Sequence, residues 1–423
     1  MILLLTFLLT LATSDTLYFS LDDAIDYALE NNPEIAQLTI EFEKSSAKVG
    51  QALSAFYPNI SATGYYAYVT DVPVIEFDSV PIPFGTHENY NIQVSLQQVI
   101  FSWGKIYNAY KISDMSHEIA RLNLLRKQQE IRYSTTNSFY GLLVLEELVK
   151  LSEESLAQLK RHEEAVESRY KAGLVSQFDL LRARVQVANL KPQIIEAQNG
   201  LNLARESFKM LLGMPLEYDF EISGELQMIE EDFDLDQLTA NALEQRAELK
   251  NVKKLESIAN LSKAIARRAN LPSIVAGATY ERRKPFSFTG DEWGSNITFN
   301  VGFQFPLFSG FNNFYQYREA SLVLKEAELA YDNLEKAITL EVKAAYLSLL
   351  AAKEALMTAQ ENVGQAEKAF EIMDTRYKNG LATNLEFMDA QLAFMQAKTN
   401  YLSALKNYNT SMAEIYKSIG KEE

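Results

Sequence analysis

A hexapeptide that occurs twice constrains the fold of this chain more than any other feature. Arg169–Leu174 reads RYKAGL and Arg376–Leu381 reads RYKNGL, 207 positions later. Each copy interrupts a stretch poor in glycine and proline, and Ser176 or Thr383 follows two residues beyond it. Glycine readily adopts the positive φ found just past a helix end, and a hydroxyl side chain caps the next helix. The sequence therefore predicts two helical hairpin tips in an internally duplicated chain.

The duplication extends to the part of the chain that precedes each tip. Ala28–Glu30 reads ALE and recurs at Ala242–Glu244, an offset of 214. Pro58 and Pro272 keep the same offset. A residue that precedes proline is pushed out of the α region toward extended structure. We therefore expect one helix of about 35 residues before each proline and a strand after it.

Alternating apolar and polar residues follow each proline and predict two strands per half. The apolar positions of the second strand in each pair are Tyr90, Ile92, Val94 and Leu96, and Ile297, Phe299, Val301 and Phe303. Such alternation over about ten residues fits a strand that crosses a bilayer in a β-barrel, although a half-buried hairpin of a soluble protein gives the same pattern. The first half has seven extra residues between its strands, within 70–89, which predicts exposed loops.

Two very long helices are predicted next, from about Gly104 to Ala172 and from about Gly310 to Asn379. In the second, apolar residues step by four or three, as in a coiled-coil seam: Leu334, Ile338, Val342, Ala345, Leu349, Ala352 and Leu356. After each tip a helix of about 37 residues returns and ends at Gly213 or Gly420. The two shorter helices of each half together match one long helix, so they can lie end to end beside it.

Composition excludes several classes of function. The chain has 56 acidic and 40 basic residues and a net charge of -16, which argues against nucleic acid as a partner. It has no cysteine, so disulfides and thiolate metal sites are absent from the sequence. Its three histidines are scattered, and no acid, base and nucleophile gather in one motif. We therefore expect no enzyme activity, no cofactor and no metal.

The first residues, Met1–Ser14, resemble a secretory signal peptide. An apolar run too short to span a bilayer precedes the small residues Ala12-Thr13-Ser14, although no basic residue precedes that run. No other segment approaches 18 consecutive apolar residues. The predicted domain boundaries are a signal peptide at 1–14, a first repeat at 15–213, a linker at 214–233, a second repeat at 234–420 and a tail at 421–423.

The number of predicted strands indicates an oligomer. One chain supplies four barrel-type strands, whereas closed barrels need about eight, and open sheet edges are not tolerated in lipid. Two chains would form a barrel hardly wider than its own side chains. Three chains would form a 12-stranded barrel. The predicted fold is thus an α+β membrane protein, in which a homotrimer combines a long α-helical coiled-coil barrel with a transmembrane β-barrel.

These motifs resemble the TolC-type family of outer-membrane efflux and secretion channels over Leu21 to Gly420. The resemblance rests on the duplicated tips, the strand ends Ile100-Phe101-Ser102 and Leu307-Phe308-Ser309, and the Leu211–Pro215 run LLGMP. It implies a homotrimer in the bacterial outer membrane with a helical tunnel through the periplasm. It also implies a passive exit duct of a tripartite efflux pump or type I secretion system, which contacts outer-membrane lipid, a periplasmic adaptor and, indirectly, an inner-membrane pump.

The resemblance assigns a role to the two tips. It implies that the tips bind the adaptor, through Gly173, Leu174, Val175 and Ser176, and through Gly380, Leu381, Ala382 and Thr383. The alternative is that these residues only form the turns. The resemblance also places Glu386 and Asp389 at the pore constriction, where three chains would form a ring of six carboxylates. Two acids three residues apart also fit an ordinary solvated helix face.

A further implied feature is a latch that holds the family's closed state through polar contacts between the tips. Asp179 and Tyr377 occupy matching positions, but Ala382 stands where the family's arginine usually completes the latch. A function from another class also remains open at this point. A periplasmic coiled-coil scaffold or adaptor without a pore would explain the helices and the signal peptide, although not four strands of membrane length.

Overall fold

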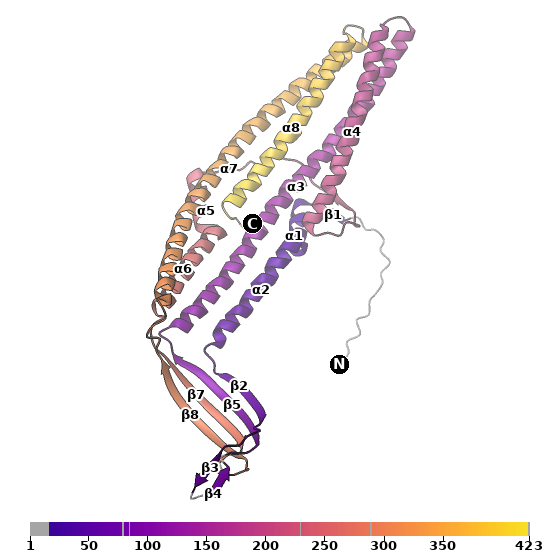
Figure 1. Ribbon diagram of the computed structural model, residues 1–423. Coiled ribbons are helices and arrows are strands. Elements are labelled where there is room, and N and C mark those ends of the chain that lie inside the picture. The colour runs from indigo at the N-terminus through magenta and orange to yellow at the C-terminus, as the bar shows by residue number, and fades with distance from the viewer. Residues whose placement is uncertain (1–16, 78–79, 84, 229, 288–289, 422–423) are drawn as a thin grey trace. The chain divides into compact units, whose positions relative to one another are not determined.

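Apart from one extra hairpin in the first half, the two halves of the chain repeat one order of helices and strands (Figure 1). The computed structural model describes residues 17–77, 80–83, 85–228, 230–287 and 290–421. The first half contains β1 (Leu17–Phe19), α1 (Leu21–Asn31), α2 (Pro33–Ser54), β2 (Asn59–Tyr68), β3 (Val74–Phe77), β4 (Val80–Pro83), β5 (Glu88–Phe101), α3 (Lys105–Lys171) and α4 (Gln177–Leu212). The second contains β6 (Phe220–Ile222), α5 (Leu235–Gln245), α6 (Ala247–Arg267), β7 (Ser273–Lys284), β8 (Gly294–Gln304), α7 (Asn312–Lys378) and α8 (Asn384–Ser418).

The chain forms two compact units, and each draws residues from both halves. Among the described residues, the first unit contains 17–39, Asn123–Leu249 and 334–421, and the second contains Ile40–Leu122 and Lys250–Asn333. The predicted signal peptide at 1–14 and the last two residues of the predicted tail at 421–423 lie outside the described residues.

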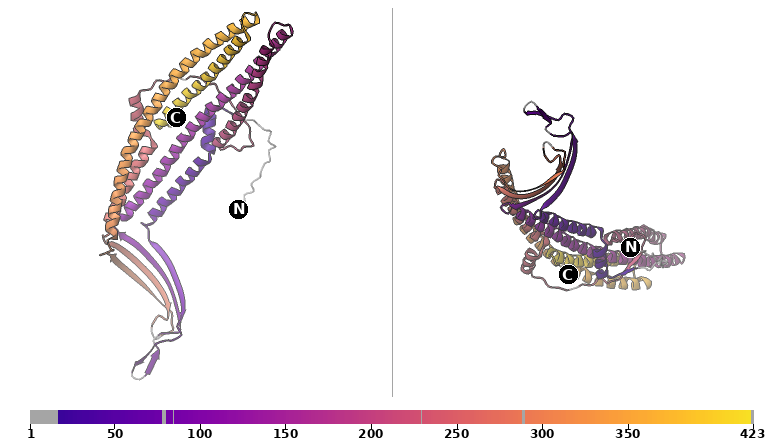
Figure 2. Two further views of the ribbon diagram at one scale, coloured as in Figure 1. Left: turned by 45° about the horizontal axis from the view of Figure 1, so that its top comes forward. Right: turned by 90° about the horizontal axis from the view of Figure 1, so that it is seen from below.

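A four-stranded antiparallel sheet dominates the second unit (Figure 2). Its order is β2-β5-β7-β8, so the strand pairs of the two halves meet where β5 runs beside β7, with Val94 opposite Tyr280. All four predicted strands are present. Among the described strands, β2 and β8 each pair on one side only. The predicted apolar face of β8 is exposed in the single chain, at Ile297, Phe299, Val301 and Phe303.

The extra residues between the first two strands fold into a hairpin of their own. Strands β3 and β4 pair antiparallel, with Val74 opposite Pro83 and Ile75 opposite Ile82. The sequence predicted only a loop in this region. Branched residues such as Val74 and Ile75 favour extended backbone, and this preference accounts for the difference.

The single helix predicted before each strand pair is wrong, because the structure breaks it in both halves. The first break is at Asn32, whose ψ of 127° is extended, and the following residue is Pro33, which disfavours helical geometry before it. The second break is at Arg246, the equivalent position at an offset of 214, with ψ of 126°. No proline follows Arg246, so the second break lacks the steric cause of the first.

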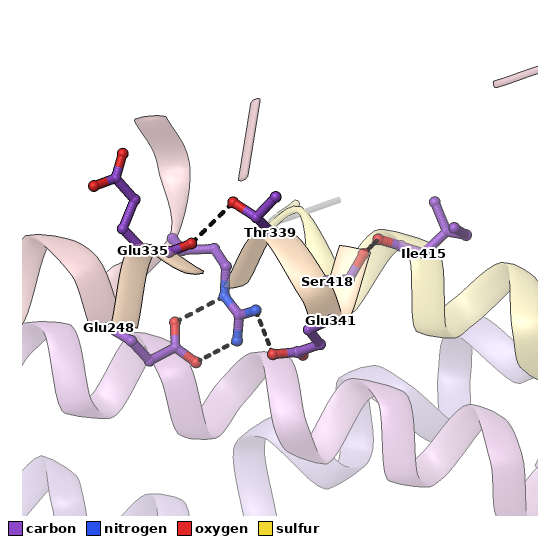
Figure 3. A network of polar contacts seen from close by, with 7 residues as sticks. Glu248, Glu335, Thr339, Glu341, Ile415 and Ser418 are labelled. Carbon is purple, nitrogen blue, oxygen red and sulfur yellow. Dashed lines mark hydrogen bonds and ion pairs between the residues drawn. The ribbon is translucent and has the colours of Figure 1, made fainter. Parts of the chain in front are cut away.

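An ion-pair network surrounds the second break. The Arg246 guanidinium is 2.9 Å from Glu248 and 2.7 Å from Glu341, and Figure 3 shows both carboxylates pointing toward it. At the first break the contacts are hydrogen bonds between uncharged groups. The Asn32 side chain donates to the Leu211 carbonyl at 2.7 Å and accepts from the Glu34 N–H at 2.8 Å. Equivalent breaks in the two halves are therefore stabilised by different chemistry.

Long helices pack along apolar seams in the first unit. Within the predicted seam of α7, five residues are buried: Ile338, Val342, Ala345, Leu349 and Leu356. A separate core gathers Phe139, Phe208, Leu212 and Phe220 from α3, α4 and β6. No helix within the described ranges combines the length and the apolar character needed to cross a membrane.

Candidate functional site at the two helix tips

The first tip is a tight turn between α3 and α4. Gly173 has φ of +77°, and the Leu174 N–H donates to the Arg169 carbonyl at 2.9 Å, which closes the end of α3. Ser176 and Asp179 then form a reciprocal capping box at the start of α4. A Cβ at Gly173 would have no heavy atom within 4 Å. The backbone angle, rather than lack of space, therefore requires glycine at this turn.

The second tip has the same geometry. Gly380 has φ of +74°, and the Leu381 N–H donates to the Arg376 carbonyl at 2.8 Å. Thr383 and Glu386 form the capping box of α8. Leu174 and Leu381 are 75% and 68% exposed, so each turn presents one large apolar side chain to its surroundings. The sequence predicted both turns and both caps correctly.

One apolar cluster packs the two tips against each other. Its buried members are Val166, Leu180, Ala183, Tyr377, Phe387 and Met388, and Val175 and Ala382 of the turns lie against it. The His162 ring stacks on Phe387, with ring centres 4.2 Å apart. This cluster, which we call the tip core, contains residues of α3, α4, α7 and α8 and fixes one tip relative to the other.

Arg169 of the first tip reaches across to the second. Its guanidinium lies 4.6 Å from the centre of the Tyr377 ring, and it donates to the carbonyls of Tyr377 and Lys378 at 3.1 and 3.2 Å. The equivalent Arg376 instead donates to the Leu381 carbonyl of its own turn at 3.2 Å. The identical arginines of the repeated hexapeptide thus make different contacts.

A buried polar contact also joins the two halves. His162 Nε2 lies 2.5 Å from Asn384 Oδ1, and Asn384 Nδ2 donates to the Asp179 carbonyl at 3.3 Å. Both side chains are buried. Burial, with a smaller effect from Arg169, lowers the pKa of His162 from its usual value. The neutral imidazole is therefore the form that fits this site.

The two predicted latch residues both lie at the tips, but no hydrogen bond joins their side chains. The Asp179 carboxylate accepts from the Ser176 hydroxyl at 2.6 Å and from the Ser176 N–H at 3.1 Å. The Tyr377 hydroxyl is buried and has no hydrogen-bond partner among the described residues. Burial raises the pKa of Tyr377, so its phenol stays protonated. The latch role of these residues stays a prediction.

The two predicted constriction acids are in different situations. The Glu386 carboxylate accepts from the Thr383 N–H at 2.7 Å and from the Thr383 hydroxyl at 2.9 Å, and these bonds lower the pKa of Glu386. Asp389 is exposed and lines a cavity of about 150 Å³ that Arg182 of α4 also lines. Within one chain, Asp389 is thus the acid that remains available for other contacts.

Sequence reasoning missed His162, Arg169 and Asn384 as contacts between the halves. His162, Val166 and Arg169 share one face of α3, because they follow the spacing of a helical seam. That spacing could have indicated that His162 and Arg169 face a neighbouring helix. It could not have identified the residues they meet, which lie more than two hundred positions away. Among the described residues, no cluster of three His, Cys, Asp or Glu side chains could hold a metal ion.

Comparisons with known proteins agree on one family. A family model described as "Outer membrane efflux protein" matches residues 24–214 and 238–421. Outer membrane protein TolC of Escherichia coli K12 is 21% identical over 380 residues, which cover 85% of this chain and 74% of TolC. The cobalt-zinc-cadmium resistance protein CzcC of Cupriavidus metallidurans is 29% identical over 126 residues, or 30% of each chain.

A solved structure shares the fold over nearly the whole chain. The CmeC outer membrane channel of Campylobacter jejuni superposes with a TM-score of 0.83 at 18% identity. The superposition covers 95% of this chain and 85% of CmeC. The fold of two repeats, each with long helices and antiparallel strands, is therefore that of these outer-membrane channels.

Proposed function

This chain belongs to the outer membrane efflux protein family, and we propose that it is the exit duct of a tripartite efflux pump or type I secretion system. Proteins of this family are outer-membrane channels with a periplasmic helical tunnel, not enzymes; they form trimers and work in tripartite pumps. Family membership argues against a scaffold without a pore. For this chain, the finer proposal is that the tips bind a periplasmic adaptor and only indirectly engage an inner-membrane pump.

The open sheet supports assembly of three chains around one barrel. Strands β2 and β8 each have an unpaired edge among the described strands, and hydrogen bonds between chains would close both edges. Three four-stranded sheets supply twelve strands. The exposed apolar face of β8 would then lie against lipid of the outer membrane. Exported substrates would cross the membrane through the inside of this barrel.

The single observation that carries the adaptor proposal is the pair of exposed turns. Gly173, Leu174, Val175 and Ser176 form one turn, and Gly380, Leu381, Ala382 and Thr383 form the other. In each turn the leucine side chain is largely exposed to solvent in the single chain. Because the tip core holds the two turns together, a helical hairpin of the adaptor could contact both at once.

Site-specific crosslinking tests this proposal in living cells. A photoreactive amino acid at Leu174 or Leu381 should give an adduct with a periplasmic adaptor, identifiable by mass spectrometry. The matched control is Leu203 on α4, which is 70% exposed and lies outside both turns. Adaptor adducts that are absent at both tips, or equally strong at Leu203, would reject docking at the tips.

We also propose that Glu386 and Asp389 line the constriction of the pore and that Asp179 and Tyr377 restrain its closed state. The Thr383 bonds orient the Glu386 carboxylate, and the freer Asp389 carries the charge that a permeating cation would meet. Three copies would form a ring of such charges.

The latch is tested by single-channel conductance in planar bilayers. Asp179→Ala should raise conductance because it removes the carboxylate. Ser176→Ala is the matched control, since it weakens the same capping box but keeps the carboxylate. Equal conductance of the wild type and Asp179→Ala would rule the latch out, and equal gains in both variants would show that only the helix cap matters.

A further inference from the structure

A cavity of about 260 Å³ lies in the first unit, away from the tip residues, between α1, the middle of α3 and the C-terminal end of α8. Figure 1 shows the C-terminus of α8 near α3, and Gln129 of α3 donates to the Gly420 carbonyl at 2.9 Å. The cavity combines three cations with three tyrosines: Arg132, Lys417, Lys421, Tyr133, Tyr140 and Tyr416. Buried Ile25 and Met412 add apolar surface.

The residues that line this cavity carry a net positive charge, whereas the whole protein carries a net negative charge. Asp22 is its single carboxylate, so the lining carries more positive than negative charge, whereas the chain has a net charge of -16. Within the part of the chain that the structure describes, Arg132, Lys417 and Lys421 have no carboxylate oxygen within 4.0 Å, although the charge of Lys417 acts on Glu130 from farther away. The nearby Glu231 carboxylate accepts from the Tyr416 hydroxyl. The three cations therefore keep charge that a bound anion could neutralise.

Aromatic rings hold two of these cations at the cavity wall. Lys417 Nζ lies 4.7 Å from the centre of the Tyr133 ring, and Lys421 Nζ lies 4.8 Å from that of Tyr416. Such contacts orient an ammonium group without neutralising it. Burial raises the pKa of Tyr133 and of Tyr140, so both phenols remain protonated and can donate a hydrogen bond.

The second half of the chain does not repeat this lining. At the offset of 207, Arg132 corresponds to Thr339, Tyr133 to Leu340, and Tyr140 to Leu347. Leu340 and Leu347 are 68% and 53% exposed. The cations and aromatic rings of this cavity are therefore not required by the repeat architecture, which is maintained in the second half without them.

We propose that this cavity binds a small organic anion with an aromatic body, such as an aryl carboxylate. Arg132 and the two lysines would bind the carboxylate, and the tyrosine rings, Ile25 and Met412 would surround the apolar part. Pockets for drug-sized ligands usually enclose roughly 300–1,000 Å³, so this smaller cavity suits one or two rings. Charge-assisted hydrogen bonds from arginine to a carboxylate give specificity for the anion over its neutral amide.

Calorimetric titration of the assembled full-length protein in lipid nanodiscs tests the proposal, with 2-naphthoate as the probe. The uncharged 2-naphthamide controls for partition of an aromatic ring into lipid. Arg132→Thr introduces the residue found at the equivalent position of the second half. Lys160→Thr removes one exposed cation elsewhere on α3 and is the matched control. Lys421→Gln provides a second, exposed variant in case Arg132→Thr fails to assemble.

The expected result is one saturable naphthoate site per chain and at least about tenfold weaker binding in Arg132→Thr or Lys421→Gln, because each change removes a charge-assisted hydrogen bond to the carboxylate. Lys160→Thr should bind like the wild type, and naphthamide should not saturate. Lack of saturable naphthoate binding to the wild type would overturn the proposal. This result is also the one expected if a second copy of the chain covers the cavity in the assembled protein. Equal binding of naphthamide, or equal affinity in all variants, would also overturn it.

Discussion

The two tips share five of six residues of their hexapeptide and the same turn, yet their side chains make different contacts. Tyr170 of the first tip is 39% exposed, whereas the equivalent Tyr377 is 5% exposed inside the tip core. Arg169 binds the opposite tip, and Arg376 binds its own. The hexapeptide thus determines the turn, while residues farther along the helices determine what each tip contacts. The two turns are therefore equivalent, whereas only the second tip places its tyrosine, Tyr377, inside the tip core.

The largest expected effect is a difference in the free energy of local opening between variants of Tyr377 and of Tyr170. Truncation of a buried aromatic side chain typically costs about 3–5 kcal/mol, and exposed substitutions usually cost far less. Tyr377→Ala should therefore lower the free energy of local opening at both tips by about 3 kcal/mol or more, and Tyr170→Ala by less than about 1 kcal/mol. Native-state hydrogen exchange of the tip amides measures this difference.

A conservative variant sharpens the same comparison. Tyr377→Phe should leave the opening free energy nearly unchanged, because the lost hydroxyl has no partner among the described residues. A large loss in Tyr377→Phe would show that the hydroxyl makes a contact in the assembled protein. Equal losses in Tyr170→Ala and Tyr377→Ala would show that the tips are equivalent after all.

A smaller expected effect is a pH dependence of the free energy of local opening at the tips. The tip core favours neutral His162, so its pKa is lower in the folded protein than in the unfolded chain. The stabilisation by neutral His162 is fully present above the pKa of histidine in the unfolded chain, about 6.5. It decreases as the pH falls below that value, because the unfolded chain then binds a proton and the folded tip does not. The free energy of local opening at the tips, obtained from hydrogen exchange after division by the intrinsic exchange rate at each pH, should therefore fall between pH 7.5 and 5.5.

His162→Gln is the matched control for this pH effect, since it keeps a donor for Asn384 but cannot titrate in this range. Its tip amides should show no such additional opening at pH 5.5. The same pH dependence in His162→Gln and the wild type would assign the effect to other groups.

The turns, the helix caps and the strands could be predicted because they depend on residues that are close together in the sequence. Positive φ at Gly173 and Gly380, the caps at Ser176 and Thr383, and the alternation in β8 depend on residues close together in sequence, and each was predicted correctly. The TolC-like fold was also identified correctly from the ordered set of duplicated motifs.

Contacts between distant segments were not predictable in the same way. At the break at Arg246 the guanidinium binds Glu341, which lies on another helix, and no local signal such as a proline marks this break. His162 was visible as a lone histidine, but its role depends on Asn384 of the other half. The repeat correctly aligned the two halves, yet it gave no information on which side chains meet between them.

The reversal potential of single channels in planar bilayers, under a KCl gradient, tests the central claim most directly. We predict that the wild type forms cation-selective channels and that Asp389→Asn reduces this selectivity markedly, because it removes the exposed charge beside the second tip. Glu217→Gln, which removes an exposed acid outside the tips, should leave selectivity unchanged. Absence of channels in the wild type would contradict the duct, and unchanged selectivity in Asp389→Asn would contradict a constriction at the second tip.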